Sequence, residues 1–86
     1  MRIVDYVKSA EREFLALPRA LRLRVSAKVM CLAGDPFPAG SRKLAGHADL
    51  YRLRCGDYRV LYHVEPSGGR VTIARVCHRK DAYRNL

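Results

Sequence analysis

The sequence is short of cysteine, acidic residues and long apolar runs. Its three cysteines (Cys31, Cys55 and Cys77) are an odd number without a CxxC pair, which argues against a disulfide framework and a zinc site. No apolar stretch approaches the roughly 18 residues that a membrane helix needs. The first residues, MRIVDYVKSAE, lack an apolar signal region with a small-residue cleavage site. We therefore expect a cytoplasmic protein without membrane contact, metal or cofactor.

The shortage of acidic residues leaves a strong positive charge. Seventeen Lys and Arg against eight Asp and Glu give +9 at pH 7. Ten of these cations, but only four of the acids, fall in residues 42–86. Such a small basic protein should be drawn to phosphates or to an acidic protein partner. Its 86 residues, 49% of them hydrophobic, are enough for one domain with a thin core, which we place at 1–86.

The first half of the chain predicts one strand and two helices. Residues 2–6, RIVDY, form a short segment with the β-branched, apolar Ile3 and Val4 and favour a strand. A helix should follow Ser9, whose hydroxyl can cap it, and should end at Pro18. A second helix should begin there and end near Gly34. Its apolar stripe at helical spacing consists of Leu21, Val25, Val29 and Leu32.

The second half predicts three strands. Residues 35–49 are punctuated by proline and glycine and are expected to form a loop. From residue 50 the apolar period changes from helical to alternating, with turns at Gly56-Asp57 and at residues 66–69, PSGG. The two helices can cover one face of the resulting sheet. The other face should be open, or partly open.

Arginines occur where these strands otherwise resemble core. Arg52 and Arg54 are two residues apart, so both should leave one sheet face about 7 Å from each other. Arg59 follows the turn and can lie opposite them if it shares that face, and Arg79 comes at the end of the last strand. Converging guanidiniums repel one another without an anion. Phosphate suits this arrangement because a guanidinium binds it through two parallel hydrogen bonds.

Two other features bear on this interpretation. The arginines could instead pair with the carboxylates of this half, which are Asp49, Asp57, Glu65 and Asp81. Tyrosines also lie nearby, and one of them could stack on a base beside the cations. Tyr58 and Tyr62 are expected to pack in the core, whereas Tyr83 lies in a polar tail.

Three segments in order carry a resemblance to a known family: KLAG (43–46), YRLRCGDYRVLY (51–62) and RVCHRKDAY (75–83). With the preceding helix pair, they resemble the RelE/ParE superfamily of toxins from bacterial and archaeal type II toxin–antitoxin systems. The resemblance covers essentially the whole chain. It implies an α+β fold with two N-terminal helices packed on a mainly antiparallel, twisted four-stranded sheet. It also implies an acidic, RelB-like antitoxin as partner.

The resemblance implies one of two activities. RelE-like members cleave mRNA in the ribosomal A site, and ParE-like members inhibit DNA gyrase and lack the RNA-cleaving residues. The RelE-like positions are occupied here, because Arg59, Arg79 and Tyr83 match in kind, and Arg52 and Arg54 stand where RelE has lysines. We therefore expect a ribosome-dependent mRNA endonuclease with these five catalytic residues. A small RNA-binding or inactive module of the same fold is a third alternative.

The residues predicted to bind mRNA or ribosomal RNA include two of the catalytic arginines and three further residues. They are Lys43, Arg52, Arg54, His78 and Lys80. Metal-free cleavage needs a base for the 2′-hydroxyl, stabilisation of the charge that grows on phosphorus, and a proton for the 5′-oxygen. Arginines can stabilise charge but cannot act as the base. By resemblance, Arg79 takes the acid role.

The identity of the base stays open at this point. Tyr83 is one candidate, because surrounding cations favour a phenolate. His78 is another, although as a strand neighbour of Arg79 it should point to the other face. Weaker candidates are His47 and His63.

Overall fold

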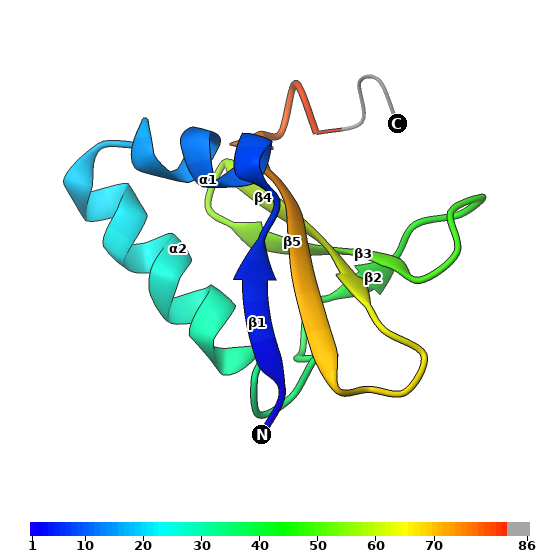
Figure 1. Cartoon of the computed structure of the whole chain (residues 1–86). Helices are drawn as coiled ribbons and strands as arrows, with labels where there is room; N and C mark the ends of the chain where they lie inside the picture. The colour runs from blue at the N-terminus through cyan, green and yellow to red at the C-terminus, as the bar shows by residue number, and fades with distance from the viewer. Residues whose placement is uncertain (83–86) are drawn as a thin grey trace.

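The computed structural model of the chain describes residues 1–82, in which two helices pack on one mixed sheet (Figure 1). The elements in chain order are β1 (Ile3–Tyr6), α1 (Lys8–Leu15), α2 (Arg19–Cys31), β2 (Arg42–Lys43), β3 (Leu50–Cys55), β4 (Tyr58–Val64) and β5 (Arg70–His78). The strand order across the sheet is β1-β5-β4-β3-β2. Strand β1 runs parallel to β5, and the other neighbours are antiparallel. Neither of these helices is long and apolar enough to cross a membrane.

The sheet has five strands where four were predicted. The additional strand, β2, lies within residues 35–49, which were predicted to be a loop. It contains only Arg42 and Lys43, and both side chains are exposed. Two basic residues cannot display an alternating apolar pattern, so the sequence carries no strand signal here. A short, charged strand at the sheet edge also discourages pairing with other chains.

Helix α1 begins one residue before its predicted cap. Val7 occupies the N-cap position in an extended conformation, and no side chain caps the helix there. The prediction that Ser9 caps this helix is therefore wrong, because Ser9 already lies in the first turn. The helix begins early because the chain leaves β1 directly: the Val7 N–H donates to the Ile73 carbonyl at 3.0 Å, one position beyond the last β1–β5 pair.

Helix α2 begins and packs as predicted. Pro18 is its N-cap, a place where a missing N–H costs nothing. Three of the four predicted stripe residues are buried, and Leu21 packs against them. The helix ends at Cys31, three residues before Gly34, and Gly34 does not adopt the left-handed conformation of a glycine cap. The three buried residues are Val25, Val29 and Leu32.

The core lies between the helices and one face of the sheet. Residues of β3, β4 and β5 that face each other across the strand pairs supply most of it, and Ala10, Leu17 and the α2 stripe close it from the helix side. Alternation therefore selects one face of the sheet for the core, as predicted. The sheet contribution consists of Leu53, Cys55, Val60, Tyr62, Val64, Val71, Ile73 and Val76.

A β-bulge changes the alternation in β5. Leu61 pairs with Arg75, whereas the next residue, Tyr62, pairs with Ile73, so Ala74 is the extra residue. A bulge shifts the side chains that follow it to the opposite face. Without it, Arg75 would share the core face with Ile73. With it, Arg75 leaves the sheet on the face opposite the helices.

Tyr62 connects the sheet to the loop after α2, and this contact can be tested. Its side chain is fully buried, its hydroxyl donates to the Pro36 carbonyl at 2.8 Å, and burial raises the pKa of its phenol. Tyr62→Phe leaves that carbonyl without its donor, so we expect a loss of about 1 kcal/mol in the free energy of unfolding, measured in urea. Tyr6→Phe is the control, because the half-buried Tyr6 hydroxyl has no hydrogen-bond partner within residues 1–82. Equal losses in both variants would contradict the assigned role of the Pro36 contact.

Candidate functional site

The strand arginines gather on the sheet face opposite the helices. Residues directly opposite each other in an antiparallel pair share a face. Arg54 lies directly opposite Arg59, and Arg52 lies opposite both Leu61 and Arg42. The structure therefore shows that Arg59 shares the face of Arg52 and Arg54, which the sequence left open. We call this surface the arginine face; its cations are Arg42, Arg52, Arg54, Arg59 and Arg75.

Arg59 is held in place by backbone carbonyls. It is only 9% exposed, and its Nη1 donates to the carbonyls of Gly56 at 3.1 Å and Tyr58 at 3.0 Å. Gly56 has φ of +60°, and a Cβ built there would lie 3.4 Å from Nη2 of Arg24 on α2. The turn is thus enclosed by two guanidiniums, and glycine is the residue that fits. Arg59 is therefore fixed without its charge being neutralised.

Arg52 and Arg54 are available to an external anion. Arg54 is exposed and Arg52 is partly exposed. Within the described part of the chain, no carboxylate lies within ion-pair distance of Arg52, Arg54 or Arg59. The alternative that these three arginines pair with carboxylates is therefore not found in the described part of the chain. Unpaired neighbouring guanidiniums favour a bound phosphate.

The arginine face is less open than predicted. Leu61 is fully buried on it, and Leu50 and Cys77 are 4% and 7% exposed. Leu61 has Arg52 and Arg75 as its direct neighbours on the two adjoining strands. The aliphatic stems of arginines cover apolar neighbours in this arrangement and keep their charged ends in water. The arginine face therefore consists of buried apolar side chains covered by cationic ones. Burial among them raises the pKa of the Cys77 thiol.

Arg79 lies one residue beyond the end of β5. Its N–H donates to the Asp57 carbonyl at 2.8 Å, which extends the β4–β5 ladder by one position. Its Nη1 is 3.9 Å from Oδ1 of Asp57, and both side chains are more than half exposed. A long, exposed ion pair of this kind contributes little. Arg79 is therefore placed near Arg59, with its charge accessible to solvent.

The remaining predicted residues are more dispersed. Lys43 pairs with Tyr51 and so lies on the side of the sheet away from Arg52. His78 pairs with Tyr58, 5.4 Å away between ring centres, and therefore lies on the side opposite Arg59, as expected. Lys80 is exposed, and its N–H donates to Nδ1 of His78 at 3.2 Å. Tyr83 lies outside the described residues.

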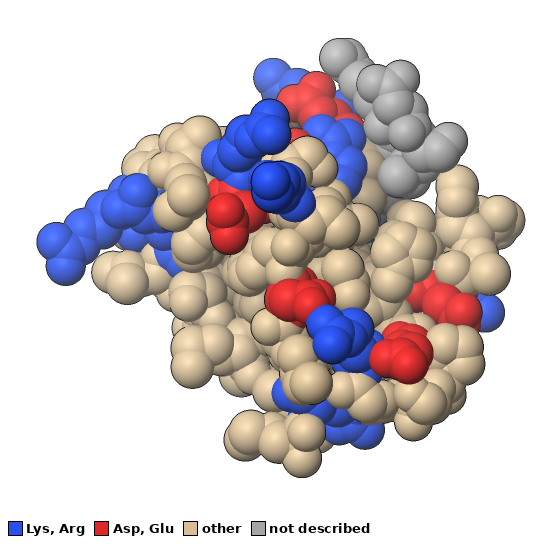
Figure 2. All heavy atoms as spheres, in the orientation of Figure 1, with Lys and Arg blue, Asp and Glu red and all other residues tan. Residues whose placement is uncertain are grey.

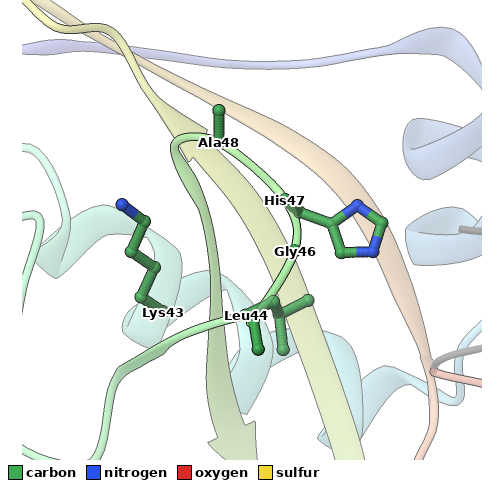
Figure 3. Close-up of a pocket in the computed structure, with 6 residues that line it drawn as sticks. Lys43, Leu44, Gly46, His47 and Ala48 are labelled. Carbon is green, nitrogen blue, oxygen red and sulfur yellow. The ribbon is translucent and has the colours of Figure 1, made fainter.

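The two weaker base candidates lie apart from Arg59. Residues 43–48 line a hollow of about 410 Å³, and Figure 3 shows Lys43 and His47 pointing away from each other across this loop. His63 is exposed on the arginine face, four residues and roughly 13 Å along β4 from Arg59. Neither histidine is positioned as its immediate neighbour by the strand register.

Two arginines of this face were missed by sequence reasoning. Arg42 belongs to the short strand β2, and Arg75 reaches the face only because of the bulge at Ala74. Arg75 forms an ion pair with Glu13 of α1 at 3.0 Å, and its hydrogen bond to Glu13 raises the pKa of the guanidinium.

The other cations in view in Figure 2 include a group at the top of the molecule, around the end of β5. No group of three His, Cys, Asp or Glu side chains in residues 1–82 is arranged to hold a metal.

Comparisons with known proteins agree with one another. Residues 2–83 match the family model described as ParE toxin of type II toxin-antitoxin system, parDE. Toxin RelG of Mycobacterium tuberculosis is 35% identical over 85 residues, which cover 94% of each chain. The archaeal RelE–RelB complex from Pyrococcus horikoshii OT3 matches with a TM-score of 0.80 and 31% identity, over 94% of this chain and 98% of that chain. The RelBE2 toxin–antitoxin complex from Mycobacterium tuberculosis matches with a TM-score of 0.78 and 28% identity, over 91% and 98%. The expected two-helix, single-sheet fold is confirmed.

Proposed function

Because this chain belongs to the RelE/ParE superfamily of toxins from type II toxin–antitoxin systems, we propose that it is an endonuclease that cleaves mRNA in the ribosomal A site. The observation that supports this proposal is the arginine face. Arg52, Arg54 and Arg59 lie on adjacent strands of one face and have no carboxylate partner among residues 1–82. This is the arrangement that an RNA phosphate requires.

The proposed reaction needs no metal. The 2′-hydroxyl attacks the adjacent phosphorus while it loses its proton to a base, and the 5′-oxygen leaves and gains a proton. The products carry a 2′,3′-cyclic phosphate and a 5′-hydroxyl. Arg59, already held by two carbonyls, stabilises the charge that grows on the phosphoryl oxygens without rearranging. Arg52 and Arg54 bind the same phosphate or its neighbour, and Arg79 meets the leaving oxygen.

Tyr83 is the proposed base. No histidine is placed beside Arg59 by the register, and His78 lies on the opposite side of the sheet. Cations near a phenol favour its deprotonated form, which can accept the 2′-hydroxyl proton. In the chain, Tyr83 follows directly after the buried Ala82.

The ribosome supplies the orientation that this small site lacks. Free RNA samples many backbone geometries, and alignment of the 2′-oxygen with the leaving oxygen accounts for much of the rate. We propose that Lys43 and His78, on the other side of the sheet, and Lys80, beyond the end of β5, contact more distant RNA phosphates and add to affinity. Cleavage of naked RNA should therefore be poor.

The proposed partner in the cell is an acidic antitoxin that is partly disordered before binding. The two solved complexes reported above contain RelE-type toxins with their antitoxins. A toxin with net charge +9 attracts an anionic segment that folds on its surface. Such a segment would compete with RNA for the same cations.

A second candidate function is inhibition of DNA gyrase. The matching family model is that of ParE toxins, and this is the observation that favours it. An inhibitor that acts by binding a protein does not need Arg59, Arg79 and Tyr83 in a common arrangement. The two candidates therefore predict different effects when Arg79 is removed.

Primer extension in a cell-free translation mixture tests the proposed function. We expect mRNA ends within codons at stalled ribosomes with the wild-type protein. Arg79→Ala should lower the cleavage rate by about 10²–10³-fold, because it removes one cation that stabilises the transition state. Its melting temperature should stay near wild type, since the side chain is more than half exposed and leaves no cavity. Intact mRNA together with loss of DNA supercoiling would support the gyrase candidate instead.

Tyr83→Phe separates two roles of the tail. If the ring only stacks on a base, the substitution should have little effect, because stacking is retained by phenylalanine. If the phenol takes the proton, single-turnover cleavage on programmed ribosomes should fall by about 10²-fold or more, with binding unchanged. We expect the second result. Equal rates for the two proteins would transfer the base role to a histidine, and His78 would then be substituted first.

A further inference from the structure

Glu13 of α1 occupies the part of the β5 edge that β1 leaves free. Strand β1 pairs with β5 only as far as Ile73, and α1 packs against β5 beyond that point (Figure 1). Oε1 of Glu13 accepts a hydrogen bond from the Val76 N–H at 2.9 Å. The carboxylate thereby replaces the carbonyl that a longer β1 would supply to this backbone donor.

The same carboxylate also contacts Arg75, which in turn contacts the segment after β5. Oε2 of Glu13 lies 3.0 Å from Nη2 of Arg75, and both side chains are about three-quarters buried. Nη1 of Arg75 donates to the Asp81 carbonyl at 2.9 Å. Because the guanidinium is planar, two hydrogen bonds from different nitrogens fix its orientation. Helix α1 is thus connected through one arginine to the segment that follows β5.

That segment carries the residues assigned to the reaction. Arg79 and Lys80 are exposed in it, and Ala82 is fully buried. Its backbone is further held by the Asp81 N–H, which donates to the His78 carbonyl at 2.8 Å. This last bond is local and fixes the shape of the turn. The Arg75 contact connects the turn to a helix more than sixty residues earlier in the chain.

We propose that Glu13 and Arg75 are positioning residues, which set the place of Arg79 and of the chain that leads to Tyr83. Arg75 shares the arginine face with Arg52 and Arg54, but it differs from them because a carboxylate neutralises it and a carbonyl occupies a second nitrogen. Its Nη1 and Nη2 donors are both occupied by acceptors within the protein. The activity readout of this inference rests on the proposed nuclease function.

Glu13→Ala gives opposite results for the two possible roles of Arg75. If Arg75 positions the segment, the single-turnover rate on programmed ribosomes should fall by about 10-fold or more, while the half-saturating ribosome concentration changes by less than about twofold. If Arg75 instead binds RNA, the substitution frees a cation, so binding should tighten and the rate should not fall. This second result would overturn the proposal.

Matched controls separate the contact from the change of charge. Glu11→Ala removes an exposed carboxylate from the same helix and should cleave at the wild-type rate. Arg75→Ala should reproduce the loss seen with Glu13→Ala. Arg70→Ala should not, although Arg70 also lies on β5 and also forms an ion pair, with Asp5. Glu13→Gln keeps an acceptor for the Val76 N–H, but its amide NH2 is a donor and cannot accept from Arg75, so it should lose rate as Glu13→Ala does. A melting temperature near wild type in Glu13→Gln excludes loss of folding as the cause.

Trypsin digestion of the folded protein tests the same inference without any nuclease activity. Cleavage after Arg79 and Lys80, followed by mass spectrometry, reports how often this segment opens. Glu13→Ala and Arg75→Ala should be cut there at least several-fold faster than Glu11→Ala and Arg70→Ala. Equal digestion of all four variants would overturn the positioning role. A wild-type protein that fails to cut mRNA would contradict the nuclease function and leave this digestion result to decide the inference.

Discussion

The register of the β3–β4 hairpin is the constraint on which the rest of the structure depends. The two-residue turn at Gly56 and Asp57 sets Arg54 opposite Arg59 and Leu53 opposite Val60. Because side chains alternate, a slip of one residue in β3 would bring arginines to the helix side and apolar residues to water. Burial of the core and exposure of the cations therefore select the same register. Gly56 permits it through a positive φ that other residues rarely adopt.

The two faces of the sheet have opposite energetic roles. The helix face removes apolar side chains from water and supplies most of the stability. The arginine face places like charges on neighbouring strands, which reduces stability until an anion binds. A core that is already closed on the other side allows this cost to persist in the free protein. A phosphate bound between these cations would relieve their mutual repulsion.

Alternation and turn chemistry explain how much could be predicted from the sequence. They predicted β3, β4 and β5, the stripe of α2 and the common face of Arg52 and Arg54, because each depends on a local period or a turn. Whether Arg59 shares that face was left open and is settled by the register of the hairpin. They did not predict β2, which is too short to show a period, or the bulge at Ala74, which has no glycine or other local signal. The contact between Glu13 and Arg75 joins residues 62 positions apart, so no local pattern indicates it.

Partners, rather than position, distinguish the arginines of one face. Arg54 is exposed and unpaired in the described structure, Arg59 is held by neutral carbonyls, and Arg75 is neutralised by a carboxylate. A carbonyl fixes a guanidinium and leaves its charge for an incoming anion, whereas a carboxylate cancels most of that charge. Preorganised charge is the property that stabilises a transition state. On this basis Arg59 is suited to act on phosphate, and Arg75 is suited to hold the protein segments that surround it.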